Sequence, residues 1–542
     1  MKRVLLFLLP AAAAAQELNI SVSNLLRYGN GTETISSVSN RRDYFENLTD
    51  SRISYLDFTL GFRLLFDQPP EYGVEFSGVQ KLFVEFRRDD IYLRAGSSYS
   101  LYGRGLALNL FENRTLAFDT GINGFKGEYK NRFLHAAVTL GDILWLDNLD
   151  LTRTEKYRIR AGSLEFLPCR SVTAGVSFVS GQSSVLPPVF PDQLAQFDIP
   201  EYFGKFQLSG LDGFLSYAEK RTTVLADTVG TIRGTAFYGS LSHISKAFGV
   251  SLEYKDYRFG ITDPFERENR NRAYRALAFQ NPPIVHKEHT FTLMSRYPHV
   301  VDFNDEVGLQ LDVFYTIFGQ LSGSFNASVA SRHYSYTPTG DTNSIFLPVY
   351  ASSDRSSSFW PSLNQAYSPF WEIYADWQYF LEAGGNDYVQ VGLNRRSQDI
   401  ANELSYTAGV GPAIEETRLT GIPLAAQYTV AEGWVVRFVL EQQWVHENMN
   451  LATTDFTNTL ISLGVSRSPD YSITVRYERT SDGATVDGRK EWFAVDASVR
   501  ISPAHSATLT VGGDRGGQVC ANGVCRIVNP FLGVRVSLLS YF

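Results

Sequence analysis

The sequence predicts an all-β fold, a single large antiparallel transmembrane β-barrel of about 24 strands, within a range of about 20 to 26. Three observations predict it. Runs of alternating apolar and polar residues recur along the chain, ionisable side chains keep to one register of each run, and the chain ends on an aromatic residue. We expect residues 16–542 to form the barrel and residues 1–15 to be a signal peptide.

The stretch from Trp434 to Trp444 shows the alternation most clearly. Its even-numbered positions are mostly apolar, whereas the odd-numbered positions include Arg437 and Glu441. Side chains in a strand alternate between two faces, so the two sets point to opposite sides of a sheet. About ten residue steps of about 3.3 Å, tilted by about 45°, rise roughly 24 Å, close to the apolar band of about 25 Å that a transmembrane strand crosses.

The same segregation predicts which charges line the lumen. A lysine or arginine facing lipid at mid-bilayer costs about 2–4 kcal/mol, so a barrel keeps its ionisable residues on the inner face. Runs at 250–255, 307–315, 471–478 and 492–501 follow this rule. We expect these charges to select among solutes, because rings of side-chain charge bias entry into a pore. The predicted lumen-lining charges are Arg437, Glu441, Arg476, Glu478, Asp496, Arg500 and Arg535.

The last stretch of the chain, from Leu532 to Phe542, also alternates. It resembles the final strand of outer-membrane β-barrels, which commonly end on a phenylalanine that the barrel-assembly machinery recognises, and it departs from that pattern only at Ser540. The resemblance implies that Phe542 is the assembly signal. An amphipathic strand that closes a soluble domain would show the same local pattern.

The chain opens with Lys2 and Arg3, a short apolar run and a row of alanines ending at Ala15. This is the pattern of a secretory signal peptide, and the run is too short to span a bilayer. Loss of the two basic residues makes the formal charge of −8 more negative by two, and no basic domain remains to neutralise phosphates. We therefore exclude nucleic acid as a partner. The signal peptide predicts export, and the resemblance of the last strand makes the bacterial outer membrane the expected location.

Connections between the runs fall into short turns and long polar segments. Outer-membrane barrels have short periplasmic turns and longer outer loops, so segments such as 29–51 and 398–414 are predicted outer loops. Counting runs back from Phe542 leaves the turn at His243 on the wrong side. A segment within 260–303 is therefore either folded inside the lumen or contains a further strand.

Alternation also fades between Tyr99 and Lys130, where glycines cluster with charged residues. A Gly-Arg-Gly step permits close approach of the backbone, and a lumen tolerates charges such as a pair between Arg114 and Asp119. The segment is either an inward-folded constriction that gates a pore or a bulged strand pair with ordinary lumen charges. The candidate constriction residues are Arg104, Glu112, Arg114 and Asp119.

Three stretches carry a family resemblance: Tyr-Gly-Arg-Gly-Leu-Ala-Leu at 102–108, the stretch 296–302, and the stretch 515–526 with its two cysteines. On these the chain resembles an uncharacterised family of predicted outer-membrane β-barrel proteins of Gram-negative bacteria, described as a domain of unknown function. The likeness covers most of the mature chain. It implies a location and an architecture but no activity.

The three cysteines predict one small closed loop. Cys520 and Cys525 enclose a short Gly-containing stretch, which favours a disulfide in an oxidising compartment. A metal site is the weaker interpretation, because the sequence there does not offer four ligands. Cys169 follows Pro168 at a predicted turn and has no evident partner. We interpret it as structural or incidental.

The histidines offer no recognisable catalytic motif, because none lies in a Gly-x-Ser-x-Gly or HExxH sequence. His286 and His289 are spaced for a metal on a helix, but a strand there would point them to opposite faces. His446 could line one wall with Glu441. An outer-membrane hydrolase would need His446 or His333 beside a carboxylate or hydroxyl in an open cleft. We predict no catalytic residue, no metal site and no cofactor.

These features together predict a pore or transport conduit for unidentified solutes. Two alternatives stay open: a barrel whose outer loops, such as 335–369, bind a partner or a surface, and an outer-membrane hydrolase. The expected partners are outer-membrane lipid and the barrel-assembly machinery, whereas no periplasmic partner is identified and no nucleic acid is expected.

Overall fold

The computed structural model describes residues 18–146, 154–186, 195–224, 231–259, 277–299, 301–338, 350–355, 358–407, 411–449 and 452–542. Its main sheet has 24 antiparallel strands. The sheet closes on itself, because β1 (Leu18–Ile35) pairs with both β2 (Val38–Tyr55) and β30 (Phe531–Tyr541). The predicted closed barrel is thus confirmed, while the predicted signal peptide, residues 1–15, lies outside the described residues.

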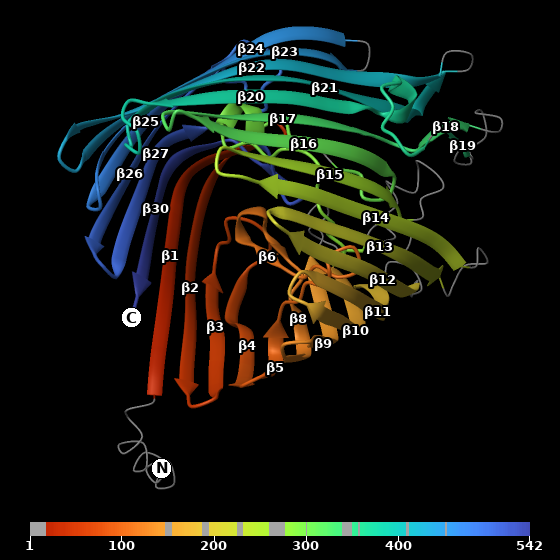
Figure 1. Cartoon of the computed structure of the whole chain (residues 1–542). Helices are drawn as coiled ribbons and strands as arrows, with labels where there is room; N and C mark the ends of the chain where they lie inside the picture. The colour runs from red at the N-terminus through yellow and green to blue at the C-terminus, as the bar shows by residue number, and fades with distance from the viewer. Residues whose placement is uncertain are drawn as a thin grey trace.

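The wall runs in sequence order, and Figure 1 shows it as a continuous band of strands coloured from red to blue. No helix in the described part of the chain is long and apolar enough to cross a membrane. The other wall strands are β3 (Phe58–Asp67), β4 (Phe76–Arg88), β5 (Ile91–Ser98), β8 (Ile122–Lys130), β9 (Leu134–Leu146), β10 (Thr154–Cys169), β11 (Val172–Leu186), β12 (Ala195–Leu208), β13 (Leu211–Val224), β14 (Thr231–Ile244), β15 (Phe248–Arg258), β16 (Glu306–Ile317), β17 (Leu321–Ser331), β20 (Phe370–Phe380), β21 (Tyr388–Thr407), β22 (Gly411–Ala431), β23 (Trp434–Met449), β24 (Ala452–Arg467), β25 (Tyr471–Thr480), β26 (Glu491–Ser502) and β27 (His505–Asp514).

Short elements lie outside the wall sheet, in the connections between its strands. The short strands pair into two-stranded sheets, and the other elements are single helical turns. They are β6 (Glu112–Asn113), β7 (Phe118–Asp119), β18 (Tyr334–Pro338), β19 (Tyr350–Asp354), β28 (Gly517–Ala521), β29 (Val524–Val528), the α-helix α2 (Thr292–Ser295), and the 3-10 helices η2 (Arg114–Leu116) and η4 (Gln365–Tyr367).

The start of β1 and the end of β30 lie together at one end of the barrel, here called the termini end; the opposite end is the loop end. Val22 and Phe542 exchange backbone hydrogen bonds of 2.9 and 2.8 Å there. The turns near His243 and Phe318 both lie at the termini end, because β15 and β16 between them pair directly. The described residues from 277 onward in this connection fold inside the lumen, which resolves the mismatch in the strand count.

Two predicted loops are wrong. The segment 29–51 belongs to the hairpin of β1 and β2, which pairs without interruption as far as Ile35 and Val38. Within 398–414, strands β21 and β22 continue to a bridge between Thr407 and Gly411. Both segments therefore continue the wall as paired strands, although their side chains are largely polar.

The outward face of the wall carries an apolar belt. Its residues are identified by strand pairing, which fixes the face of every residue once one is known. On β23, for example, Trp434 and Trp444 share the outward register, and Trp444 is 45% exposed. Exposed members of the belt include Leu64, Phe178, Tyr217, Leu393, Leu463, Ile473, Val511 and Val536.

Polarity is reversed on the loop-end half of β10. Tyr157 and Ile159 face inward and are fully buried at 0% exposure. Lys156, Arg158 and Arg160 alternate with them and face outward. The expectation that every ionisable residue faces the lumen is therefore wrong here. The inner face of this part of the wall is apolar because chain segments inside the barrel pack against it.

Candidate functional site in the lumen

Three connections at the loop end fold into the barrel. We call them the first insert (99–121), the second insert (277–305) and the third insert (515–530); they follow β5, β15 and β27, respectively. Figure 1 shows β6 of the first insert inside the ring of wall strands. For Tyr99 to Lys130 the sequence predicts either an inward-folded constriction or a bulged strand pair. Residues 99–121 fold inward, whereas the remaining residues form the wall strand β8.

The first two inserts are hydrogen-bonded to each other. The backbone N–H of Asn109 donates to the carbonyl of Phe279 at 2.8 Å, and its side chain donates to the carbonyl of Asn281 at 2.9 Å. Gln280 donates back to the carbonyl of Leu106 at 3.1 Å. Phe279 and Leu106 are fully buried in one apolar core together with Tyr157 of the wall. Burial of each large apolar side chain contributes about 1.5–3 kcal/mol, so these inserts are held firmly against β8–β15.

A wall carboxylate on the opposite side holds the second insert. Glu441 on β23 accepts the backbone N–H groups of Thr292 at 2.9 Å and Leu293 at 2.7 Å, the start of α2. Gln443 donates to the carbonyl of Leu293 at 3.1 Å. Each hydrogen bond to a charged group is worth about 1.5–3 kcal/mol. Glu441 is thus a fastening point for the second insert as well as a lumen charge.

Two further wall carboxylates bind side chains of the second insert. Arg296 forms an ion pair with Glu478 at 2.5 Å, and His289 lies 2.8 Å from Glu372. All four groups are nearly buried. Burial, with the neighbouring His299 as a second cause, lowers the pKa of His286 well below its usual range. The second insert therefore spans the lumen from β8–β15 to β20–β25.

The third insert is the hairpin of β28 and β29, and its predicted disulfide between Cys520 and Cys525 is confirmed. The N–H of Asn522 donates to Glu288 of the second insert at 2.8 Å. Gly523 has a φ of 75°, and a Cβ there would stand 2.4 Å from the ring of Phe303, so only glycine fits. The hairpin is packed against the second insert at its tip.

Reducing this disulfide is expected to loosen the hairpin without unfolding the barrel. Loss of a native disulfide typically costs about 2–5 kcal/mol, and the short loop favours the low end, so amide hydrogen exchange within Gly517–Val528 should accelerate by about tenfold or more. Exchange mass spectrometry of a Cys520→Ala, Cys525→Ala variant measures this. Replacement of the exposed free Cys169 with alanine is the control and should change nothing.

The candidate constriction residues Glu112 and Asp119 both meet cations of the wall. Glu112 pairs with Arg63 at 2.6 Å and with Lys81 at 2.8 Å. Lys81 also pairs with Asp119 at 2.9 Å, and Tyr99 donates to Asp119 at the same distance. These contacts fasten the first insert to β3 and β4.

The expected pair between Arg114 and Asp119 does not form. Arg114 pairs instead with Glu46 on β2 at 2.5 Å, because the η2 turn separates it from Asp119, which faces Lys81. Arg104 lies apart from both, with its guanidinium 5.1 Å above the ring of Phe214. Arg114 and Asp119 are expected to pair because they are close in sequence. Their partners lie instead on the wall strands β2 and β4, far away along the chain.

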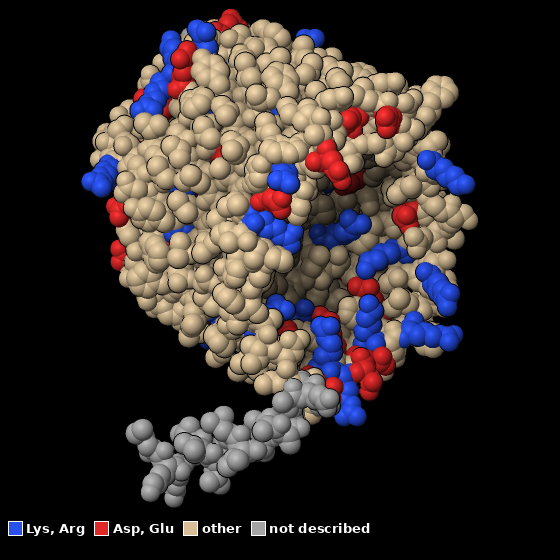
Figure 2. Space-filling view, turned by 90° about the vertical axis from the view of Figure 1, so that its left-hand side faces the viewer, with Lys and Arg blue, Asp and Glu red and all other residues tan. Residues whose placement is uncertain are grey.

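The seven predicted lumen charges all lie on the inward register. Strand pairing places Arg437, Asp496 and Arg535 in one row that crosses β23 to β30. Arg476 pairs with Asp496 at 2.8 Å. A cavity of about 330 Å³ beside α2 is lined by Arg437, Arg476 and Glu441, among others. Figure 2 shows a deep opening into the molecule with Lys, Arg, Asp and Glu on its wall. Their role in selecting solutes stays a prediction.

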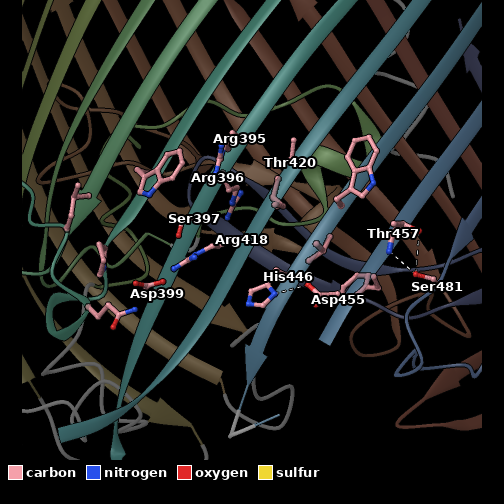
Figure 3. Close-up of a pocket in the computed structure, with 18 residues that line it drawn as sticks. Arg395, Arg396, Ser397, Asp399, Arg418, Thr420, His446, Asp455, Thr457 and Ser481 are labelled. Carbon is pink, nitrogen blue, oxygen red and sulfur yellow. Dashed lines mark hydrogen bonds and ion pairs between the residues drawn. The ribbon is translucent and has the colours of Figure 1, made fainter. Parts of the chain in front are cut away.

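His446 does not share a wall with Glu441, which corrects that expectation. The two are five residues apart on β23, so His446 faces outward, where it lies 2.7 Å from Asp455. It borders a depression of about 760 Å³ on the outer wall, shown in Figure 3 with Arg395 and Arg418. Among the described residues, no group of three or more His, Cys, Asp or Glu is arranged to hold a metal ion.

His333 is fully buried, at 0% exposure. It contacts Asp305 at 2.9 Å and Asp256 at 3.1 Å. A hydrolase would need His333 beside a carboxylate or hydroxyl in an open cleft. The carboxylates are present, but the ring is buried and does not lie in an open cleft. The arrangement ties the end of the second insert to β15.

A family profile described as "Family of unknown function (DUF6029)" matches residues 1–542. The chain belongs to this family. The resemblance drawn from the three sequence stretches is thereby confirmed, and membership in DUF6029 assigns no activity. No curated protein matches the sequence.

Several solved structures of barrel proteins are similar to this DUF6029 member. The siderophore receptor PirA from Pseudomonas aeruginosa is 8% identical, with 97% of this chain and 80% of that chain covered and a TM-score of 0.45. The translocation pore of the P pilus usher PapC is 9% identical, with 97% and 99% covered and a TM-score of 0.41. OccK5 (OpdH) from Pseudomonas aeruginosa is 11% identical, with 75% and 97% covered and a TM-score of 0.34.

Proposed function

We propose that this protein is an outer-membrane conduit for unidentified polar solutes and that its three inserts close it in the state described. The observation that carries the proposal is the division of the lumen. One part is a hollow with charged walls, visible in Figure 2, and another is filled by the chain's own inserts. A charged, water-accessible lumen suits polar solutes, and inserts held to the wall by non-covalent contacts can move as a gate.

The outer-membrane location follows from the same proposal. The belt that includes Leu393, Ile473 and Val511 presents exposed apolar side chains on the outside of a closed wall, as a lipid-facing surface does. The termini end would face the periplasm and the loop end the exterior. In water these side chains would be costly to expose.

Ionic conductance across planar bilayers tests the conduit. We expect the full chain to be mostly closed and a variant without the second insert to conduct. A variant that folds as a barrel and still passes no current would overturn the proposal.

Deletion of Phe542 is expected to lower assembly of the barrel in cells severalfold or more. The residue is 72% exposed, so its removal costs little packing, but it carries two hydrogen bonds to Val22 that extend the pairing of β1 with β30 to the last residue. The amount of heat-modifiable protein in outer-membrane fractions measures assembly. A Phe542→Tyr variant keeps the aromatic end and should assemble normally; equal yields for all three proteins would rule out Phe542 as an assembly signal.

A further inference from the structure

The depression on the outer wall has an ordered set of lining groups. It spreads over the outward register of β20 to β24, and Figure 3 shows its labelled side chains gathered over these neighbouring strands. Strand pairing places eight of its lining residues in two rows. The row nearer the termini end holds Arg395, Thr420, Trp444 and Thr457, and the next row holds Ser397, Arg418, His446 and Asp455.

The depression lies at the loop-end border of the apolar belt. One step toward the termini end, the outward residues Leu393 and Ile422 are apolar and 48% and 39% exposed. Trp444 is a member of the first row, and Trp371 on β20 pairs with Ser397 and so extends the second row. Tryptophan is enriched at membrane interfaces, where its ring sits at headgroup level. If the belt spans the hydrocarbon, as the proposed function requires, the depression lies at the level of lipid headgroups.

The polar groups there are suited to a phosphorylated sugar. Arg395 forms no ion pair with any residue that the structure describes, and Arg418 is 60% exposed although its Nε contacts Glu416. Arginine presents a planar fork of donors that matches phosphate oxygens in pairs. The hydroxyls of Thr420 and Thr457 and the flat face of a tryptophan supply the hydrogen bonds and contact area that a sugar ring uses.

We propose that this depression binds the phosphorylated sugar headgroup of a glycolipid in the leaflet at the loop end. The two arginines hold phosphate, and the acyl chains lie along Leu393 and Ile422 below. A lipid is the occupant because the depression is continuous with the apolar belt, so a ligand there has one end in polar surroundings and the other against hydrocarbon. The inference rests on the proposed membrane location but does not depend on conduction.

Native mass spectrometry of the full chain in detergent tests the site with one probe, an acylated glucosamine disaccharide that carries two phosphates. We expect an Arg395→Gln, Arg418→Gln variant to bind it at least about tenfold more weakly than the natural sequence. Arg467→Gln is the matched control. Arg467 is also an outward arginine near a tryptophan, 5.9 Å from the Trp434 ring, but it lies at the termini end and should leave affinity unchanged.

Two comparisons complete the test. The same disaccharide lipid without phosphates should bind the natural sequence as weakly as the double variant binds the phosphorylated one. Phosphatidylglycerol, which has a phosphate but no sugar, should not displace the probe. Equal affinity of the double variant and the natural sequence, or full displacement by phosphatidylglycerol, overturns the proposal. Because lipid binding is read without current, its failure is distinct from failure of the conduit.

Discussion

A variant in which a short Gly-Ser linker replaces residues 277–304 is expected to form a conducting pore. This change removes the chain that spans the lumen between Phe279 and α2 while it leaves β15 and β16 paired. Single-channel recording in planar bilayers should show long-lived openings, with a mean current at least about tenfold above that of the full chain.

The deletion is needed because single substitutions are too weak. Losing Glu441 removes two hydrogen bonds worth about 1.5–3 kcal/mol each, but the buried Phe279 and its apolar neighbours on the second insert still hold the opposite side. A Glu441→Ala variant should therefore flicker open rather than stay open. If neither variant passed more current than the full chain, the second insert would not be what closes the path.

The opened pore is expected to prefer cations. Without the second insert, Glu372, Glu441 and Glu478 lose His289, the Thr292 and Leu293 N–H groups, and Arg296, respectively. Exposed carboxylates attract cations into a narrow passage. Reversal potentials in a salt gradient measure the preference, and Glu441→Gln in the deletion background should reduce it. Replacing the β18–β19 hairpin (Tyr334–Asp354) by a short linker is the control and should leave the pore closed.

The wall could be predicted from sequence because its determinants are local. A strand alternates with a period of two, so Trp434 to Trp444 alone separates the outward from the inward residues. The same alternation placed all seven lumen charges on the inward register. Apart from the β1–β30 pair that closes the barrel, each wall strand then pairs with the wall strands next to it in sequence.

The inserts could be recognised only as places where alternation fails. Their contacts join residues far apart in the chain, such as Arg114 with Glu46 and Thr292 with Glu441, and no local pattern encodes such partners. The reversed polarity of Lys156 to Arg160 has the same origin. Arg158 faces outward because Ile159 must face the apolar core that the inserts complete. The sequence does indicate this reversal, because three cations alternate there with Tyr157 and Ile159.

Replacing Lys255 with methionine is expected to destabilise the barrel strongly. Lys255 is 0% exposed and pairs with Glu306, which is also buried and lies 3.2 Å from His299 of the second insert. Removing one member of a buried pair leaves an uncompensated charge and costs about 3–5 kcal/mol. The midpoint of denaturant unfolding in detergent micelles should fall accordingly, and the second insert should loosen first because Glu306 also accepts the N–H of Asp302 at 2.7 Å.

We expect the destabilisation to come from the unpaired buried charge rather than from lost packing. A second substitution distinguishes these two causes. A Lys255→Met, Glu306→Gln variant removes both charges at nearly constant volume and should recover most of the stability, because the buried carboxylate is gone. Lys205→Met is the matched control. Lys205 pairs with Glu165 at 3.1 Å but is 41% exposed, so its loss should cost no more than about 1 kcal/mol. The contrary result is a double variant as unstable as Lys255→Met alone. Lost packing around the lysine stem would then account for most of the destabilisation. The buried charge would not be what fastens the second insert to β15.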